Sequence, residues 1–334
     1  MNSHEFSAIM NLTTNDSLNV TDSSFLARTR WDIAVIGVVQ LSICLLAFFG
    51  NLVVIAAIFK CDKLRDEPCN LFLVNLSFVD LGSSVFVMGS SFVSLVADHW
   101  PFGQPWCDFI CMANYLFIVV SMLTLSLISV DRYQAIFHPL RYTGHVTKRK
   151  VLVAIVYTWT QGLCISVVPV AFRWIEYNYW EVVCAIQWYK QQHQAVYYVI
   201  ISFVTSFLIP GMILVVCYGR VLRLACQKSS CDVNVHLSTT ENYSVSRRAI
   251  ISLLVVVVMF LICMAPFSVT KLYNVTVSKE NSLPRYIYLI ASLAAFLSSA
   301  VNPLIYGILR KDFKEAFDIL LKRIKRKCLN FLPI

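Results

Sequence analysis

The sequence predicts an all-α integral membrane protein, a seven-transmembrane helix bundle with a short amphipathic cytoplasmic helix after the seventh span. Two observations predict it. The chain is 58% hydrophobic and only 14% charged, with a mean hydropathy of +0.67, more apolar surface than a soluble domain of 334 residues could bury. A bilayer core of about 30 Å also needs about 20 mostly apolar residues per helix. Seven stretches meet that length, at residues 33–60, 69–97, 108–133, 151–174, 195–226, 248–273 and 285–307.

The predicted spans divide the chain into an extracellular tail (1–32), a seven-transmembrane domain (33–307) and a cytoplasmic amphipathic helix with a basic tail (308–334). Three acceptor triplets for N-glycosylation lie in the first tail, beginning at Asn11, Asn15 and Asn19. A polar tail rich in Asn, Ser and Thr also produces such triplets by chance, so glycosylation is one of two readings.

Basic residues predict the orientation of the chain. Most of the 28 lysines and arginines lie in the loops after the first, third and fifth spans and in the C-terminal tail. The positive-inside rule makes that side cytoplasmic, so the N-terminus of this multi-pass protein is expected outside the plasma membrane. The net charge of +9 then reflects topology and attraction to anionic membrane lipids, and no nucleic acid partner is needed to explain it.

Two of the twelve cysteines are expected on the oxidising side of the membrane. Cys107 begins the third span, and Cys184 lies in the loop after the fourth. We predict a disulfide between them, which would pin an aromatic-rich loop over the extracellular mouth; the alternative is two free buried thiols.

Asp80 is the carboxylate that lies deep within a predicted span, where polar groups are costly and mark a pathway, a site or a switch. Polar residues at similar depth are Asn51, Ser121, Ser298, Ser299 and Asn302. One carboxylate among neutral oxygens suits an allosteric sodium ion or a proton better than a transition metal, and no other cofactor is predicted. The alternative is a hydrogen-bonded core that merely holds helices together.

An ordered set of motifs across roughly residues 33–318 resembles the rhodopsin-like (class A) G protein-coupled receptors. Asp131-Arg132-Tyr133 ends the third span, and Asn302-Pro303 precedes Tyr306 in the seventh. Further matches are Gly50, Asn51, Leu76, Asp80, Trp100, Cys107, Trp159, Pro169, Pro210, Tyr218, Phe260, Pro266 and Phe313. The resemblance implies a receptor that binds an extracellular signal between its helices and admits a heterotrimeric G protein when the sixth helix moves. Arrestin is a further candidate partner.

Asp131 can hold the neighbouring Arg132 guanidinium as an ion pair at rest, and its release would let Arg132 reach Tyr218, Tyr306 and the partner. Pro139 and Leu140 offer an apolar knob on the loop that follows. The full set of predicted coupling residues is Asp131, Arg132, Tyr133, Pro139, Leu140, Tyr218, Arg247, Arg248, Asn302, Pro303 and Tyr306.

Two departures from the family pattern change the expected mechanism. Met264 stands where the sixth helix usually carries a tryptophan, so a flexible thioether replaces the indole that senses the ligand. Ser246, followed by Arg247 and Arg248, stands where an acidic partner often restrains the conserved arginine. One restraint on the resting state is therefore missing, and we expect basal signalling.

The expected ligand pocket argues against two ligand classes. Asn114 occupies the position of the amine-binding aspartate, and Phe296 that of the retinal-binding lysine. A neutral, aromatic lining suits a small, weakly polar or lipid-like ligand, although the same residues could simply pack the bundle. Lys271 could meet an acidic ligand or extend to lipid headgroups. The predicted lining is Asn114, Tyr115, Ile118, Ser202, Phe203, Ser206, Met264, Phe267, Lys271, Tyr288, Ser292 and Phe296.

The C-terminal tail combines a basic run with Cys328, and palmitoylation there would add a second membrane anchor. Similarity to amine-receptor-like orphan receptors, one of them associated with cilia, makes the ciliary membrane a candidate location. No phosphate loop, paired carboxylates or metal-ligand spacing supports an enzyme. A transporter lacks the expected internal repeat, and a non-signalling scaffold is opposed by the intact Asp131-Arg132-Tyr133.

Overall fold

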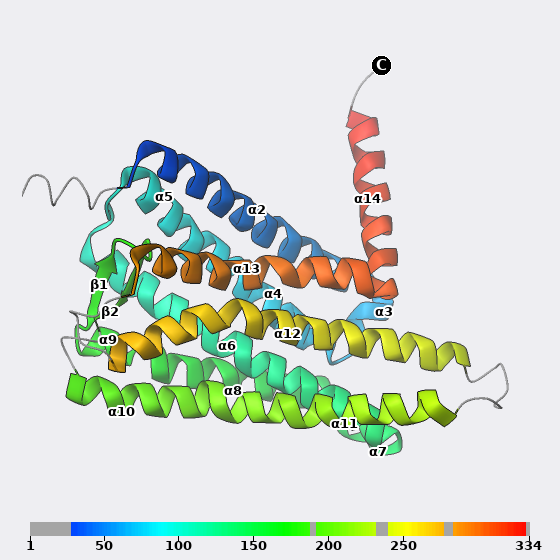
Figure 1. Ribbon diagram of the computed structural model, residues 1–334. Helices are drawn as coiled ribbons and strands as arrows, with labels where there is room; N and C mark the ends of the chain where they lie inside the picture. The colour runs from blue at the N-terminus through cyan, green and yellow to red at the C-terminus, as the bar shows by residue number, and fades with distance from the viewer. Residues whose placement is uncertain (1–27, 188–191, 232–239, 277–282, 332–334) are drawn as a thin grey trace, which may run out of the picture.

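The computed structural model describes residues 28–187, 192–231, 240–276 and 283–331. Within these ranges, seven helices are long and apolar enough to cross a membrane, and they lie side by side in one bundle (Figure 1). A two-stranded hairpin covers one end of the bundle, here called the hairpin end. The other end, called the tail end, carries α14 (Lys311–Phe331), which projects steeply away from the bundle axis.

The predicted spans are confirmed, with ends that differ by a few residues. The observed spans are Arg30–Lys60, Asn70–Ala97, Gly103–Phe137, Lys148–Ala171, Val196–Val221, Leu254–Val275 and Arg285–Leu309. The third begins at Gly103 instead of 108, because its first turn reads Gly-Gln-Pro-Trp and is not recognised as part of an apolar run.

The helices that build these spans follow one another in chain order. They are α2 (Arg30–Lys60), α4 (Asn70–Gly82), α5 (Gly89–Ala97), α6 (Gly103–Phe137), α8 (Lys148–Ser166), α9 (Val168–Ala171), α10 (Gln192–Phe203), α11 (Ile209–Cys231), α12 (Thr240–Thr276) and α13 (Arg285–Leu309). Short helices α3 (Asp62–Arg65) and α7 (Pro139–His145) lie between spans near the tail end.

Local sequence explains where several helices begin. Thr29 and Asp32 form a reciprocal capping box at the start of α2, which satisfies backbone N–H groups that have no partner inside the helix. Thr147 accepts a hydrogen bond from the Lys150 amide at the start of α8. Pro139 occupies the first turn of α7, where a missing N–H costs nothing.

Two spans contain π-helical segments that the sequence does not announce. Ser83–Met88 (η1) separates α4 from α5, and Val204–Leu208 (η3) separates α10 from α11. A π-helical turn carries an extra residue and changes the direction in which later side chains point, and such turns often lie at functional sites. Both segments lie in spans that contribute predicted site residues, Asp80 before η1 and Ser206 within η3.

The predicted helical fold is confirmed, with one short addition in an extramembrane loop. Residues between the fourth and fifth spans form an antiparallel hairpin of β1 (Ile175–Asn178) and β2 (Val183–Ile186), in register with Tyr177 opposite Cys184. The alternation that marks a half-buried strand is absent, because all four residues of β2 are buried. The sequence therefore carries no simple strand signal in this loop.

Close packing between α6 and α8 depends on one glycine. A Cβ atom at Gly162 would lie 2.7 Å from Cδ1 of Leu116 and 3.1 Å from Cγ2 of Val120. The absent side chain lets the two helices approach at the level where α6 carries its site residues, and small residues commonly serve this purpose between membrane helices.

Candidate functional site

Asp131 and Arg132 form an ion pair near the tail end of α6. Both Nε and Nη2 of Arg132 donate to Oδ2 of Asp131, at 3.0 and 2.7 Å. Asp131 is buried, so the carboxylate is largely removed from competing water. Charge-assisted hydrogen bonds of this kind are about twice as strong as neutral ones, and the guanidinium is held locally in this structure.

Tyr142 is a partner of this pair that sequence reasoning missed. Its hydroxyl donates to Oδ1 of Asp131 at 2.9 Å, from α7 in the loop that follows the third span. Burial raises the pKa of the Tyr142 phenol above its ordinary value, and the Asp131 carboxylate raises it further, so the hydroxyl stays protonated and able to donate. The loop conformation is thereby linked to the ion pair.

The two tyrosines predicted to receive Arg132 are buried in one hydrophobic cluster and have spare hydrogen-bonding capacity. The hydroxyls of Tyr218 on α11 and Tyr306 on α13 have no hydrogen-bond partner among the described residues. An unpaired buried hydroxyl is costly. Their positions are consistent with a second arrangement in which another group meets them.

The remaining coupling residues surround this pair. Tyr133 stacks on Phe137 with ring centroids 4.6 Å apart and accepts a hydrogen bond from Arg220 of α11 at 3.0 Å. Pro139 begins α7, and Leu140 beside it is 93% exposed. The side chains of Arg247 and Arg248 on α12 lie outside the described residues, so their predicted role stays a prediction.

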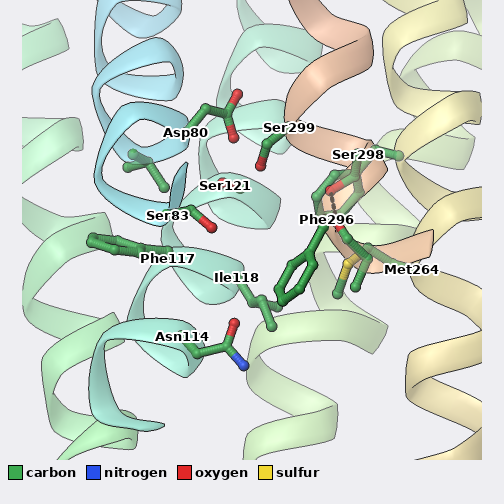
Figure 2. A pocket seen from close by; sticks show the side chains of 13 residues that line it. Asp80, Ser83, Asn114, Phe117, Ile118, Ser121, Met264, Phe296, Ser298 and Ser299 are labelled. Atoms are coloured by element: carbon green, nitrogen blue, oxygen red, sulfur yellow. Dashed lines mark hydrogen bonds between the residues drawn. The ribbon is translucent and has the colours of Figure 1, made fainter. Parts of the chain in front are cut away.

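Asp80 lies in the middle of the bundle at the edge of a narrow cavity (Figure 2). The cavity has a volume of about 30 Å³, which is room for roughly two water molecules. Ser121, Ser298 and Ser299, all predicted companions of Asp80, line it with their neighbours. Oδ2 of Asp80 accepts a hydrogen bond from Nδ2 of Asn302 at 2.9 Å. The donor set fits a small monovalent cation, because one carboxylate is joined by neutral hydroxyls.

Asn51 supports this site from outside the cavity. Its Nδ2 donates to the backbone oxygens of Ala47 at 2.9 Å and Ser299 at 3.0 Å, which ties α2 to α13. Pro303 of α13 packs closely against Gly50 of α2, because a Cβ on Gly50 would lie 2.9 Å from its ring. Asn51 therefore positions the backbone that carries Ser299.

The cavity continues from Asp80 toward the predicted ligand pocket. Asn114, Ile118, Met264 and Phe296 line the same space, and Figure 2 shows the Phe296 ring between the level of Asp80 and that of Asn114. Met264 is buried at its side. The predicted ion site and the predicted ligand pocket thus share one space.

Other predicted pocket residues are buried with unsatisfied hydroxyls. Tyr115, Ser206 and Ser292 have no hydrogen-bond partner among the described residues. Tyr288 donates to the side chain of Asn274 at 2.7 Å, and Phe267 is buried one turn from Lys271. Ser202 is half-buried in α10.

Phe203 does not belong to the pocket lining, and its assignment is corrected. Its side chain is 45% exposed and stacks on Phe207, with ring centroids 6.1 Å apart. The π-helical segment η3 begins at the next residue, and such a turn changes the direction in which the following side chains point.

The predicted disulfide between Cys107 and Cys184 is confirmed, with Cα atoms 5.4 Å apart. It joins the start of α6 to β2 and holds the hairpin against the bundle. The hairpin also contacts α12, because Nζ of Lys271 donates to Oε2 of Glu181 in the hairpin turn. Lys271 thus points inward instead of extending to lipid headgroups, and Glu181 is a residue that sequence reasoning missed.

A cap forms where the N-terminal segment meets the hairpin. The buried Arg28 lies 3.4 Å from Asp98 and stacks over Tyr179, its guanidinium carbon 4.0 Å from the ring centroid. Tyr179 donates to Asp98 at 2.7 Å. Burial raises the pKa of the Tyr179 phenol, which keeps this donor protonated.

Cys107→Ser is expected to lower the amount of receptor at the cell surface strongly. The bond closes a loop with a sequence separation of 77, and a chain-entropy estimate for such a loop is about 4 kcal/mol. Surface labelling should show that Cys107→Ser/Cys184→Ser loses no more than either single variant. Cys164→Ser, at an exposed position of α8, is the matched control and should be neutral; additive losses of the two single variants would contradict the prediction.

Comparisons with known proteins agree with this fold and this arrangement of residues. Residues 50–306 match the family described as "7 transmembrane receptor (rhodopsin family)". The chain is 28% identical over 309 residues to G-protein coupled receptor 161 of Xenopus tropicalis, covering 83% of this chain and 58% of that protein. It is 27% identical over 303 residues to 5-hydroxytryptamine receptor 4 of Cavia porcellus, covering 84% and 77%. The structure of squid rhodopsin matches with a TM-score of 0.78 at 21% identity, covering 89% of this chain and 87% of that one.

The chain belongs to the rhodopsin family of seven-transmembrane receptors, the class A G protein-coupled receptors. These relatives are receptors and not enzymes. The chain spans 54–58% of the length of the curated 161-type relatives that it matches. The likeness to squid rhodopsin shows the fold alone.

Three predictions fall outside what the structure describes. The acceptor residues Asn11, Asn15 and Asn19 precede the first described residue. Cys328 lies within α14, but its side chain is not among those described. The division of the chain into an extracellular tail, a membrane domain and a cytoplasmic tail also stays a prediction.

Proposed function

We propose that this protein is a plasma-membrane receptor that transmits an extracellular signal to a heterotrimeric G protein at the tail end of the bundle. The observation that carries this proposal is the Asp131–Arg132 ion pair, together with the buried hydroxyls of Tyr218 and Tyr306, which have no hydrogen-bond partner among the described residues. That arrangement supplies a held state for the guanidinium and a destination once it is released. The ciliary membrane is a second candidate location, and arrestin a second candidate partner.

The proposed orientation places the hairpin end outside the cell. It is supported by the Cys107–Cys184 bond, since disulfides persist on the oxidising side of a membrane. The basic residues that follow the first, third and fifth spans favour the tail end as cytoplasmic. The amphipathic α14 would then lie at the inner leaflet, with palmitoylation of Cys328 as a further proposed anchor.

We propose that the cavity at Asp80 is a switch linked to an allosteric sodium ion. Asp80, Ser121, Ser298 and Ser299 would hold the ion, which would supply a positive charge that balances the buried carboxylate. Asn302 links this site to the seventh helix through its bond to Asp80. Because Asn302 precedes Pro303, a change at Asp80 would reach the helix segment that carries Tyr306.

The proposed ligand is a small molecule that binds between Met264 and the hairpin end of the bundle. Asn114 offers no carboxylate to balance a cationic amine in a buried site, which separates this chain from an amine receptor despite its similarity to a 5-hydroxytryptamine receptor. The aromatic and hydroxyl lining favours a weakly polar or lipid-like body. We also propose basal signalling, because Met264 offers a weaker barrier than an indole between the ligand pocket and the Asp80 cavity.

Agonist-free output in cells tests the proposal. Cyclic AMP in both directions and calcium would be measured at several levels of surface expression. We expect one of these outputs to change in proportion to the amount of receptor. Silence at every expression level, together with failure of the purified protein to accelerate nucleotide exchange on any heterotrimer, would contradict it.

Leu140→Ala is expected to weaken coupling about tenfold while leaving surface expression unchanged. The Leu140 side chain is 93% exposed, so it leaves apolar surface in contact with water. Covering that side chain with a partner would contribute about 1.5 kcal/mol or more to binding. Nucleotide exchange on the coupled G protein would be measured across receptor concentrations. Leu152→Ala, at a leucine of α8 that is 52% exposed, is the matched control; an equal loss in both variants would remove the argument for a docking knob.

A further inference from the structure

A buried ion pair joins the hairpin to the sixth span. The side chains of Lys271 and Glu181 are 12% and 3% exposed, and Nζ of the lysine donates to Oε2 of the glutamate. Two charges removed from water are costly unless each is compensated, and loss of one partner leaves the other uncompensated in a poorly solvated site. Whatever occupies this place must therefore supply one negative charge to Lys271.

Hydrogen bonds within the hairpin turn hold the Glu181 carboxylate in this position. Oδ1 of Asn178 accepts hydrogen bonds from the amides of Trp180 at 3.0 Å and Glu181 at 3.2 Å. Nδ2 of Asn178 donates to the free carboxylate oxygen of Glu181 at 3.2 Å. Val182 then adopts φ +57°, a strained conformation for a β-branched residue. Strain of this kind persists only where the surroundings enforce it, and Val182 is packed against Leu95 and Leu289.

The surroundings of the pair belong to the predicted ligand pocket. The Lys271 ammonium lies 5.0 Å from the centroid of the Phe267 ring, a distance at which a cation is attracted to the aromatic face. Glu181 is within electrostatic reach of Tyr115, whose buried hydroxyl has no hydrogen-bond partner among the described residues. A cation and an aromatic face thus meet where the loop carboxylate enters.

We propose that Lys271 forms the centre of a carboxylate-binding subsite beneath the hairpin. Glu181 occupies it in this structure, and a carboxylate of an extracellular ligand would take its place when the hairpin moves. The exchange conserves charge, so the buried ammonium is compensated both before and after ligand binding. This inference rests on the proposed receptor function for its meaning, and it narrows the ligand to an acidic molecule with an apolar body.

Chemical rescue of Glu181→Ala tests the subsite directly. The substitution removes from the side chain a fragment that corresponds to acetate. The thermal unfolding midpoint of the purified whole chain in lipid nanodiscs would be measured against sodium acetate, with total ionic strength held constant by sodium chloride. We expect Glu181→Ala to unfold several degrees below the unsubstituted protein, and acetate to restore most of that loss in a saturable manner.

Three controls separate binding from general stabilisation. Acetamide has the shape of acetate without its charge and should restore nothing. Glu176→Ala removes an exposed carboxylate from the same hairpin, and its midpoint, whatever its value, should not respond to acetate. Adding Lys271→Met to Glu181→Ala removes the ammonium and should abolish the rescue.

The proposal is overturned by a well-folded Glu181→Ala that acetate does not stabilise, or by a rescue that persists with acetamide or with Lys271→Met. If Glu181→Ala does not fold, Glu181→Gln keeps the shape of the side chain and loses only the charge. Its midpoint should then fall, and Lys271→Gln in the same chain should recover part of the loss; additive losses would overturn the proposal. None of these measurements involves a G protein, so the subsite and the coupling can fail separately.

Discussion

Arg132→Ala is expected to lower coupling to the G protein by about 30-fold or more, while the receptor still folds and reaches the cell surface. In this structure the guanidinium touches Asp131 near the end of α6 and is partly exposed, so its removal leaves no cavity in the apolar core. A charged group that crosses an interface to hydrogen-bonding acceptors contributes about 2 kcal/mol or more. Its loss corresponds to a roughly 30-fold fall in coupling, measured as nucleotide exchange per surface receptor.

Two further variants test whether the effect is specific to Arg132 and to its release from Asp131. Arg149→Ala removes an exposed positive charge at the start of α8 and should leave coupling intact. Asp131→Asn removes the acceptor that holds Arg132, while the Tyr142 hydroxyl can still bond to the amide oxygen, and should raise agonist-free output. Normal coupling by Arg132→Ala at matched surface expression would contradict the switch proposed here.

The spans and the disulfide could be predicted because each depends on features that can be read from the sequence alone. A span is one contiguous apolar segment, and a lipid environment requires its backbone to be helical. Cys107 and Cys184 could be paired from the redox compartment of their loops. No knowledge of how the helices pack is needed for either prediction.

The hairpin turn and its contacts depend on tertiary structure that no local sequence pattern predicts. Glu181 lies 90 residues from Lys271 along the chain, and the disulfide, the Asn178 turn and the packing of Val182 bring the two together. Lys271 could be recognised as unusual, but its partner could not. The exposure of Phe203 likewise depends on how its helix packs in the bundle, which cannot be read from the sequence.

The polar part of the Asp80 cavity could be predicted from the sequence, but its extension could not. Its polar residues share a depth in the membrane that span positions reveal, but the continuation past Met264 to Asn114 depends on how side chains fill the space between helices (Figure 2). An indole at position 264 would occupy more of that space than a thioether. A substitution visible in the sequence therefore has a geometric consequence that only the packed bundle displays.

Asp80→Asn is expected to abolish the response of basal signalling to sodium. If sodium binds the resting state through Asp80, raising its concentration to ten times the dissociation constant favours that state about tenfold, because a ligand shifts an equilibrium by its differential affinity. Replacing external and vesicle sodium by N-methylglucamine should therefore raise nucleotide exchange in the unsubstituted receptor. In Asp80→Asn the two ionic conditions should give equal rates, because the neutral amide no longer compensates a cation.

The size of the basal rate in Asp80→Asn separates a switch from a structural role. The amide oxygen that this substitution introduces can still accept the hydrogen bond that Asn302 gives to Asp80 at 2.9 Å, so the helix contact survives and the protein should fold. Asp66→Asn, at an exposed carboxylate outside the bundle, should keep the full sodium response. A sodium response that persists in Asp80→Asn would place the ion elsewhere, whereas an unsubstituted receptor that ignores sodium would leave Asp80 as a polar contact between helices and remove the ion from the mechanism.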